Sequence, residues 1–577
     1  MRSYPLTVLK FGSSVLRSEA DLPAAVHEIY RWVRNGHRVI AVVSAIGNST
    51  EELLARARAF GQGVSEHAVA TLLATGESTS AALLTLALDR AGIPAAILDE
   101  VRLGLRTQGP VLNSEPCGID VSAVERALED SSAVVVPGFV GRQDDGTVSL
   151  LGRGGTDLTA VFVAHELQAD CCRLIKDVDG IYEYDPASSE RLPRRYRTLT
   201  WAEADRVNGG IVQAKAVHFA ERHGFSFEVA ALNSDSPSLI CARPAAFYDG
   251  QHDSSPLRVG LLGAGTVGLG VYRYLAAHPD RFHITGIGVR HLERGDGTPS
   301  RLLTPDPWEV VNSNCELVVE LIGGLWPAKE LIEASLNAGK HVITANKLVI
   351  SHWGHELREL AVRKGVQLLY SGAVGGAVPM LEQVRQIAET HGVRALSGVV
   401  NGTTNFILDR VAEGVPRDEA LTEAQRLGFA ELDPTTDLDG SDAAHKLALL
   451  AHAAFGTYLH PNQIERTGIE HFDAEAARAA AGSGLSVRLV ATLEGGGDGL
   501  KACVEPQFVG LSHVFAQARN EENCLQIRAQ TGELFYIRGK GAGRWPTAEA
   551  VMADVFDVCR AVRPEIIERC LTAGRVL

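Results

Sequence analysis

Residues 257–268 read LRVGLLGAGTVG and join an apolar run to a glycine pattern. The run predicts a buried strand that ends in a tight turn and opens a helix, and its glycines follow the GxGxxG spacing. The first glycine permits the turn, the second lets backbone amides approach a pyrophosphate, and the third allows close helix packing. A glycine turn without ligand is the alternative. The predicted dinucleotide-binding residues are Gly263, Gly265, Thr266, Val267 and Gly268.

The residues after this turn continue in the same rhythm. Strand-like and helix-like runs alternate in the order TVGLGVYRYLAAH, FHITGIGV, ELVVELIGG, AKELIEASLNAG and HVITA. This order predicts a doubly wound Rossmann domain over residues 257–353. From residue 354 to residue 577 the mixed runs predict an α+β substrate and dimerisation domain, whose last part returns to the nucleotide domain.

Residues 1–243 form a second region of alternating patterns. Strand-like runs such as HRVIAVVSA and AVVVPGFVG alternate with helix-like runs such as TSAALLTLALDRAG, which predicts an α/β domain. Residues 244–256 are rich in Pro, Gly, Asp and Ser and show neither period, so we interpret them as a linker.

Composition excludes several classes of partner. The chain has 577 residues, of which 45% are apolar and 22% are charged, so it can bury several cores. A net charge of −15 without a basic stripe argues against nucleic acid and membrane partners. We find no leader and no segment long and apolar enough to span a bilayer, and the nine cysteines lack zinc-ligand spacing. We expect a cytoplasmic protein acting on small molecules.

The end of the second predicted strand bears on cofactor choice. An NAD site usually places an acid there for the ribose hydroxyl, but this strand ends Gly288-Val289-Arg290. Arg290 is suited to a 2′-phosphate, which favours NADP, although NAD stays an alternative and a solvated surface arginine is the simpler interpretation.

Beyond the nucleotide domain, charged residues stand inside apolar or glycine-rich segments. Asp442 and Lys446 are four apart on a predicted helix and therefore share one face. A surface ion pair has the same spacing. Lysine suits the reduction of an aldehyde, because an ammonium both donates a proton and stabilises negative charge on oxygen.

Seven ordered blocks of the C-terminal half resemble homoserine dehydrogenase: LLGAGTVG, VVELIGG, AGKHVITANK, GAVGGAVP, NGTTNFIL, AQRLGFAELDPTTDLDGSDAAHKL and GKGAGRWPTAEAV. The resemblance implies NAD(P)H-dependent reduction of aspartate 4-semialdehyde to homoserine. It implies catalytic roles for Lys347, Lys446 and Asp442, and substrate binding by Glu431, Asp437, Gly402 and Thr403. A Rossmann reductase for another semialdehyde is the alternative.

The same resemblance implies a structural sodium ion held mainly by backbone carbonyls. The matching positions are Ser371, Val374, Gly376 and Val378. Ser371 departs from the family, which usually has Glu there; backbone coordination would survive this change without the carboxylate.

The N-terminal half shows a second resemblance. Lys10 precedes a small-residue turn, and residues 152–157 read GRGGTD, so both segments suit phosphate groups, although ordinary turns look the same. Together with VVSAIGNSTEELL, LLATGESTSAALL and LIKDVDGIYEYDP, they resemble the aspartate kinase catalytic domain of the amino acid kinase family. The resemblance implies that ATP and Mg²⁺ bind here. It implies phosphoryl neutralisation by Lys10, substrate contacts by Ser44, Glu77, Arg153 and Asp157, and nucleotide contacts by Asp177 and Tyr182.

Several departures leave a catalytically inactive structural or regulatory domain as the alternative. KFGG is here KFGS, Ala187 replaces an Arg, Ile211 stands where we expect a nucleotide-facing Lys, and Lys176 stands where many members have Thr. The order of the halves resembles bifunctional aspartokinase/homoserine dehydrogenase, but without the ACT regulatory modules that usually lie between them. We therefore expect no threonine feedback through such modules, and we expect a homo-oligomer, either a dimer or a tetramer.

Overall fold

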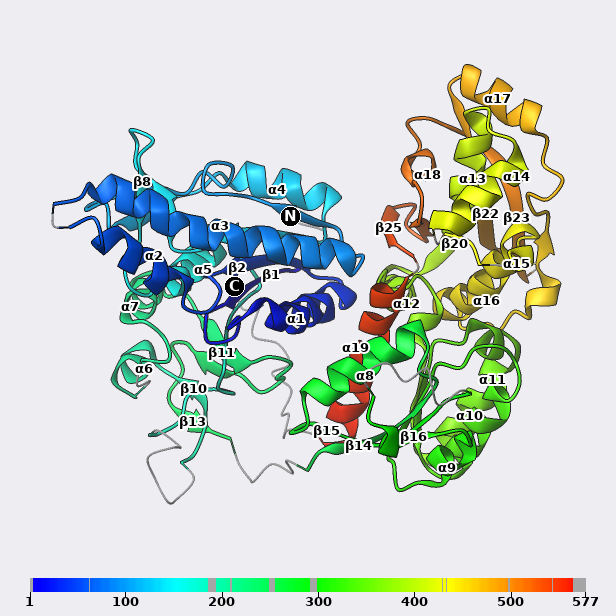
Figure 1. The fold of residues 1–577 in the computed structure, drawn as a ribbon, viewed down its shortest axis with the longest axis horizontal. Coiled ribbons are helices and arrows are strands. Elements are labelled where there is room, and N and C mark those ends of the chain that lie inside the picture. The colour runs from blue at the N-terminus through cyan, green and yellow to red at the C-terminus, as the bar shows by residue number, and fades with distance from the viewer. Residues whose placement is uncertain are drawn as a thin grey trace. The chain divides into compact units, whose positions relative to one another are not determined.

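The computed structural model describes residues 4–61, 63–184, 193–207, 210–248, 255–290, 298–427, 429–431, 433–496, 499–541 and 543–563. The chain divides into two compact units, with residues 4–248 and 560–563 in the first and residues 255–559 in the second (Figure 1). Each unit is described by itself.

A nine-stranded sheet forms the centre of the first unit, in the order β13-β10-β12-β11-β9-β1-β2-β6-β3. Its middle strands are parallel and almost wholly buried because helices cover them. The strands are β1 (Leu6–Phe11), β2 (Arg38–Val43), β3 (Ala95–Ile97), β6 (Ala133–Pro137), β9 (Cys171–Lys176), β10 (Tyr196–Leu199), β11 (Phe227–Ala231), β12 (Ser238–Ile240) and β13 (Ala246–Phe247).

A smaller sheet accompanies it, in the order β5-β4-β7-β8. Its strands are β4 (Arg106–Gln108), β5 (Glu115–Gly118), β7 (Val140–Arg142) and β8 (Val148–Leu150). The helices of this unit are α1 (Leu22–Arg34), α2 (Ser49–Arg58), α3 (Glu66–Arg90), α4 (Val121–Asp130), α5 (Gly155–Glu166), α6 (Trp201–Val207) and α7 (Ala214–His223).

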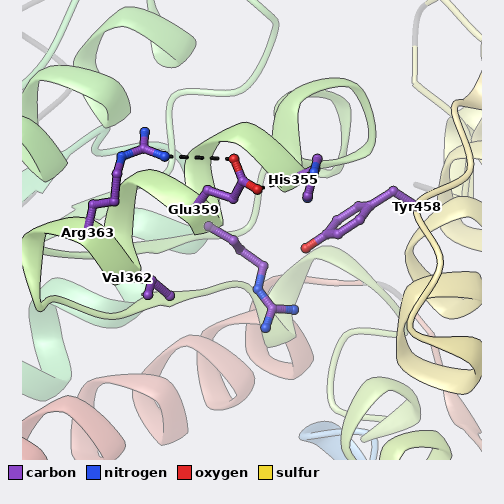
Figure 2. A pocket seen from close by; sticks show the side chains of 6 residues that line it. His355, Glu359, Val362, Arg363 and Tyr458 are labelled. Atoms are coloured by element: carbon purple, nitrogen blue, oxygen red, sulfur yellow. Dashed lines mark ion pairs between the residues drawn. The ribbon is translucent and has the colours of Figure 1, made fainter.

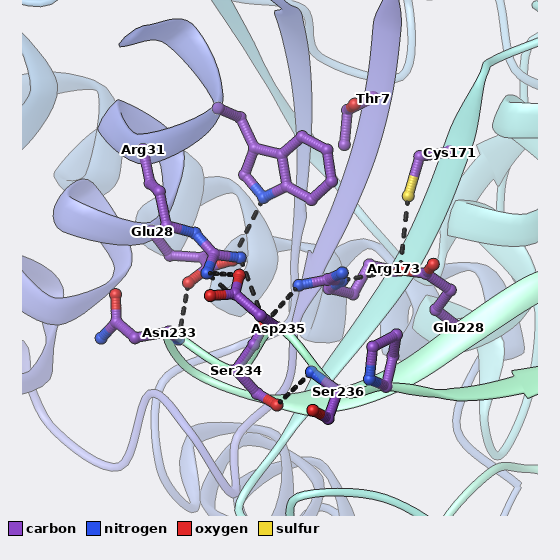
Figure 3. Close-up of polar contacts among 12 residues, drawn as sticks. Thr7, Glu28, Arg31, Cys171, Arg173, Glu228, Asn233, Ser234, Asp235 and Ser236 are labelled. Carbon is purple, nitrogen blue, oxygen red and sulfur yellow. Dashed lines mark hydrogen bonds and ion pairs between the residues drawn. The ribbon is translucent and has the colours of Figure 1, made fainter. Parts of the chain in front are cut away.

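A buried polar network ties α1 to the sheet of this unit (Figure 3). The Glu28 carboxylate accepts hydrogen bonds from Arg31 at 3.0 Å and from the backbone of Asn233 at 2.7 Å. Arg173, on β9, donates to Glu228 and to the Ser234 carbonyl, both at 2.8 Å. The network therefore anchors the segment after β11 against α1 and β9 in the interior.

Helix α3 has 25 residues and is long and apolar enough to cross a membrane by length and composition alone. Half of its most apolar window is buried, and the helix packs on α1, α2 and β6 of the same unit. The hydroxyls of Thr75, Ser78 and Thr79 donate to carbonyls of the preceding turn of this helix.

The second unit begins with a parallel sheet in the order β16-β15-β14-β17-β18-β19. In chain order this is 3-2-1-4-5-6, which confirms the predicted doubly wound nucleotide domain. Its strands are β14 (Leu257–Leu262), β15 (Phe282–Gly288), β16 (Leu303–Thr304), β17 (Leu317–Glu320), β18 (His341–Thr344) and β19 (Leu368–Leu369). Its helices are α8 (Thr266–Ala277), α9 (Pro307–Asn312), α10 (Ala328–Asn337) and α11 (Lys347–Lys364).

A second, mostly antiparallel sheet follows, in the order β21-β23-β22-β20-β24-β25. Its strands are β20 (Val393–Val399), β21 (Glu465–Arg466), β22 (Leu485–Gly496), β23 (Gly499–Gly510), β24 (Glu522–Ala529) and β25 (Leu534–Lys540). The helices are α12 (Met380–His391), α13 (Gly402–Ala412), α14 (Arg417–Leu427), α15 (Thr435–Leu438), α16 (Ser441–Phe455), α17 (Ala474–Gly482), α18 (Val514–Gln517) and α19 (Arg544–Val562).

Two details position the site. The segment QLLYSGAV forms a strand only over its first two leucines, because Ser371–Ala373 turn into a 3-10 helix ahead of two glycines with positive φ. Helix α19 lies against the nucleotide domain, where Phe556 packs edge-on against Tyr274 and Phe282 (Figure 1). The α/β architecture predicted for both halves is confirmed.

Candidate functional site

Three charged side chains meet where α11 and α16 lie side by side. Asp442, in the first turn of α16, places its two oxygens 2.9 Å from Lys347 Nζ and 2.7 Å from Lys446 Nζ. Lys347 is the first residue of α11, and Lys446 lies one turn beyond Asp442. The side chains of Asp442 and Lys446 are 6% and 11% exposed, whereas that of Lys347 is 37% exposed. The structure thus brings together the three residues predicted to be catalytic in this unit.

The electrostatics of this cluster favour its charged form. Burial alone would raise the pKa of Asp442, but Lys446 and Lys347 hold it well below its usual range. Asp442 in turn raises the pKa of Lys347 against the effect of burial, with smaller contributions from Asp437 and the exposed Glu431. Burial and Asp442 raise the pKa of Asp437. Lys347 is therefore held protonated and able to donate.

Asn401 joins the predicted acids, although sequence reasoning did not select it as a site residue. Its amide nitrogen lies 2.7 Å from Asp437 Oδ1 and 2.8 Å from Asp442 Oδ2. Its side-chain oxygen accepts from the Thr404 backbone at 2.9 Å and so caps α13. An asparagine side chain can do both because its amide carries donors and an acceptor. The preference of asparagine for helix N-caps was the available signal.

Gly402 and Thr403 occupy the first turn of α13. A Cβ on Gly402 would lie 2.7 Å from the Cα of Glu521, so the glycine permits two backbone segments to approach. The Thr403 hydroxyl donates to the Phe429 carbonyl at 2.6 Å. Both residues therefore hold the backbone next to Asn401 in place. Their contact with substrate stays a prediction.

The GxGxxG turn lies between β14 and α8. Gly263 has a φ of 107°, and a Cβ there would lie 2.6 Å from the Leu321 carbonyl oxygen. A Cβ on Gly268 would lie 2.1 Å from the Gly263 carbonyl oxygen. Around Gly265, by contrast, no atom of the described chain lies within 4 Å of such a Cβ. The outer glycines thus serve the fold, and the middle one leaves space for a phosphate at the start of α8.

Alanine substitutions should separate these two roles. We expect Gly268→Ala to lower both thermal stability and NADPH affinity, because the new Cβ meets a backbone oxygen. Gly265→Ala should keep the melting temperature but weaken NADPH binding about tenfold or more, because its methyl group fills the phosphate space. NADPH fluorescence titrations and thermal unfolding measure both. Unchanged NADPH affinity in Gly265→Ala would contradict this placement.

Thr266 and Val267 open α8, at the same turn. Arg290 lies two residues beyond the end of β15 and is exposed. Parallel strands present their carboxyl ends to one edge of the sheet, so Arg290 is on the edge where the cofactor is expected.

Glu320 is a site residue that the sequence analysis missed. It ends β17 fully buried and accepts from the Thr344 hydroxyl and the Ile322 backbone, at 2.6 and 2.7 Å. Burial raises its pKa despite these bonds. Thr344 also accepts from the backbone of Asn346, which caps the helix that starts at Lys347. A single acid at the end of an apolar strand was the signal.

Three charged side chains also meet in the first unit. Asp157, in the first turn of α5, lies 2.7 Å from Lys10 Nζ and 2.9 Å from Lys176 Nζ, all three being nearly buried. Burial alone would raise the pKa of Asp157, but the two lysines hold it well below its usual range. Burial and Lys10 lower the pKa of Lys176 to about 8. Two ammonium groups around one carboxylate can neutralise a transferring phosphoryl group.

Glu77 and Ser44 both contact the backbone of Ala45. Glu77, on α3, is 2% exposed and accepts from the Ala45 backbone at 3.4 Å. The Ser44 hydroxyl lies 3.4 Å from the carbonyl oxygen of the same residue. Burial raises the pKa of Glu77 to about 7. The structure thus brings these two predicted aspartate ligands together at the end of β2.

Replacing Glu77 with Gln should stabilise the first unit at alkaline pH. The folded pKa of about 7 lies above the ordinary value of 4.5, so Glu77 favours folding below pH 4.5, and this contribution is lost as the pH rises through 7. At about 1.4 kcal/mol per tenfold change in proton affinity, the loss reaches about 3 kcal/mol. Glutamine does not ionise. Urea unfolding of both chains at about pH 5 and about pH 8 measures the difference. A stability difference independent of pH would count against the buried acid.

The other predicted kinase residues lie on two segments. Arg153 is exposed in the turn before α5, and Asp177 is exposed directly after β9. The Tyr182 hydroxyl donates to Asp179 at 2.8 Å, five residues beyond Asp177 in the chain. Ala187 lies outside the described residues.

Lys215 was missed because the sequence analysis sought a nucleotide-facing lysine at Ile211. Its amine, on the first turn of α7, donates to the Leu151 carbonyl at 2.7 Å and to Asn113 at 2.5 Å. It lies 3.2 Å from where a Cβ on Gly152 would stand. Lys215 therefore brings a positive charge to the glycine-rich turn before α5.

The predicted sodium positions lie at the turn between β19 and α12. The Ser371 hydroxyl lies 2.5 Å from a Glu382 oxygen and 2.7 Å from an Asp554 oxygen. Two acids from neighbouring helices therefore lie beside Ser371, the position at which the family usually has Glu. The four positions, which the chain does bring to one turn, are Ser371, Val374, Gly376 and Val378.

An open pocket of about 400 Å³ lies at the other end of α11 (Figure 2). Figure 2 shows the Glu359 carboxylate between His355 and Arg363. Its oxygens lie 3.5 Å from His355 Nε2 and 3.7 Å from an Arg363 nitrogen. The predicted site residues are not among those that line the pocket, which are His355, Arg358, Glu359, Val362, Arg363 and Tyr458.

Comparisons with known proteins cover both halves. Family models match at residues 5–229 (amino acid kinase family), 263–371 (homoserine dehydrogenase, NAD binding domain) and 379–556 (homoserine dehydrogenase). The homoserine dehydrogenase of a Synechocystis species is 37% identical over 52% of this chain and 73% of its own length. That of Corynebacterium glutamicum is 34% identical over 56% and 76%. The crystal structure of a homoserine dehydrogenase from Thiobacillus denitrificans is 35% identical, with a TM-score of 0.52 over 54% of this chain and 75% of that one.

Proposed function

This chain belongs to the homoserine dehydrogenase family and carries an amino acid kinase domain ahead of it, and from that premise we propose that its second unit reduces aspartate 4-semialdehyde to homoserine with NADPH. The observation that carries the proposal is the Lys347, Asp442 and Lys446 cluster, formed between a helix of the nucleotide domain and a helix of the substrate domain. A reducing cofactor and an aldehyde bound in these two domains would meet beside two ammonium groups.

The cluster suits the proton part of this reaction. A nicotinamide cofactor held at the Gly265 turn supplies the hydride when bound. As the carbonyl carbon accepts it, the electron pair of the C=O bond moves to oxygen, and an ammonium N–H of Lys347 or Lys446 protonates that oxygen. Asp442 orients both amines and keeps Lys347 charged, and the ammonium that does not transfer its proton stabilises the negative charge.

Two acids are suited to the substrate's own ammonium group. Asp437 lies in the Asn401 hydrogen-bond network, and Glu431 lies close enough to influence the pKa of Lys347. We assign both to the amino group of the substrate. A Rossmann reductase for another semialdehyde is the competing function.

Substrate comparison tests the assignment. Succinate semialdehyde has the same aldehyde and chain length but no amino group, so its kcat/KM should be lower by about a hundredfold or more. Glutamate 5-semialdehyde, longer by one carbon, should be poorer by about tenfold or more. Equal kcat/KM for aspartate 4-semialdehyde and succinate semialdehyde would contradict the role of Glu431 and Asp437.

We also propose that the first unit phosphorylates the side-chain carboxylate of aspartate with ATP and Mg²⁺. Lys10 and Lys176 would neutralise the transferring phosphoryl group, and Lys215 would supply the cation that the sequence analysis sought at Ile211. Aspartate-dependent formation of ADP, with Lys10→Ala as the control, tests this. Its absence in a chain with full dehydrogenase activity would favour a structural or regulatory domain.

The remaining proposals concern cofactor choice, ion and assembly. Arg290 favours NADP over NAD, which the ratio of the two kcat/KM values measures. The turn at Ser371, with Glu382 and Asp554 beside it, is proposed to bind Na⁺. The homo-oligomer and the cytoplasmic location stay predictions.

A further inference from the structure

A second bond joins α11 and α16 one turn away from the charged cluster. The Ser351 hydroxyl lies 2.8 Å from His445 Nδ1, and the two residues are only 8% and 9% exposed. Ser351 is one turn beyond Lys347 on α11, and His445 is next to Lys446 on α16. The two helices thus carry two successive cross-links, the charged cluster and the serine–histidine pair.

The protons of this pair can be assigned from its neighbours. The Ser351 hydroxyl donates to the Leu348 carbonyl at 3.1 Å, and a carbonyl can only accept. With the serine proton on that carbonyl, the serine oxygen accepts from His445 Nδ1, which then carries the ring proton and leaves Nε2 as an acceptor. His352 Nδ1, 3.4 Å from the same serine oxygen, lies 2.8 Å from the Leu348 carbonyl.

Ionisation argues against His445 as a proton relay for Lys347. Burial and the neighbouring His352 lower the pKa of His445 to about 4, with smaller effects of Asp442, Lys347 and Arg466. Asp442 raises the pKa of Lys347 above its ordinary value. A proton passing from Lys347 to His445 would move to a much weaker base. Any effect of His445 on the reaction must therefore come from position.

We propose that Ser351 and His445 are positioning residues for the dehydrogenase, because their hydrogen bond fixes α11 against α16 and so sets Lys347 opposite Asp442. The catalytic consequence rests on the proposed function. The Lys347 side chain is long and 37% exposed, so the position of its amine depends on where α11 begins relative to α16. Arg358 donates to His452 farther along the same two helices. The Ser351–His445 bond lies nearer to the charged cluster, so it has the larger effect on the position of Lys347.

Three variants test the pair. Asparagine in His445→Asn can place its amide N–H where Nδ1–H was, whereas glutamine in His445→Gln reproduces only the Nε2 position. Ser351→Ala removes the acceptor. We expect kcat to fall about tenfold in His445→Gln and Ser351→Ala with KM for NADPH unchanged, and His445→Asn to recover most of kcat.

The ionisation of Lys347 gives a readout independent of activity. It is followed by NMR titration of the reductively ¹³C-methylated chain, with the signal assigned by Lys347→Arg. We expect the pKa of Lys347 to stay raised in the wild type and His445→Asn and to fall toward its ordinary value in His445→Gln and Ser351→Ala. The same pKa in all four chains would overturn the proposal, as would equal kcat in His445→Gln and His445→Asn. A wild type without dehydrogenase activity would refute the proposed function, while the pKa comparison would still decide the positioning role.

Discussion

Replacing Lys446 with Ala is expected to lower kcat for NADPH oxidation by aspartate 4-semialdehyde by about a thousandfold. The Lys446 amine is held by Asp442 at 2.7 Å and by the Val400 carbonyl at 2.6 Å, so its position leaves it one N–H for the substrate oxygen. Removing it takes away a preorganised charge at the point where negative charge develops. Stopped-flow and steady-state assays measure kcat, and NADPH fluorescence measures binding.

NADPH affinity should change little in Lys446→Ala, because the glycine turn lies on other elements of the unit. Lys329→Ala is the matched control, since Lys329 also pairs with an acid, Glu333, four residues away on an α10 surface. The control should keep wild-type turnover. Near-normal turnover in Lys446→Ala would remove this lysine from the chemistry.

Replacing Asp157 with Asn is expected to destabilise the first unit by about 3 kcal/mol at neutral pH. Asp157 is 2% exposed and holds two buried ammonium groups, which would then repel each other. Lys176 limits the cost, because its pKa of about 8 would fall further and it would lose its proton. Urea unfolding of the full chain, followed by Trp32 and Trp201 fluorescence in the first unit, measures the change.

The pH dependence of this loss has a definite sign. The folded pKa of Asp157 lies below its ordinary value of 3.8, so its stabilisation is present above pH 3.8 and disappears as the pH falls through the folded pKa. The difference between variant and wild type should therefore shrink in acid. Asp130→Asn, at the exposed end of α4, should show no such loss. Equal stability of Asp157→Asn and the wild type at neutral pH would contradict the buried cluster.

Sequence patterns predicted those features of the fold and site that depend only on residues close together in the chain. The glycine spacing after β14 and the four-residue separation of Asp442 and Lys446 each follow from one element, and the structure places them as expected. The order 3-2-1-4-5-6 follows from alternating strands and helices.

What local patterns could not predict are contacts between distant segments. Asn401 reaches Asp442 across 41 residues of chain, and Ser351 reaches His445 across 94. Neither residue type is distinctive in sequence, because buried Asn and Ser most often serve helix caps or turns.

The most direct test of the central claim is NADPH oxidation by the purified chain on addition of aspartate 4-semialdehyde, with homoserine identified as the product. We predict oxidation that requires the semialdehyde, yields homoserine in equal amount, and disappears in Lys446→Ala. A purified chain that binds NADPH but forms no homoserine would contradict the account.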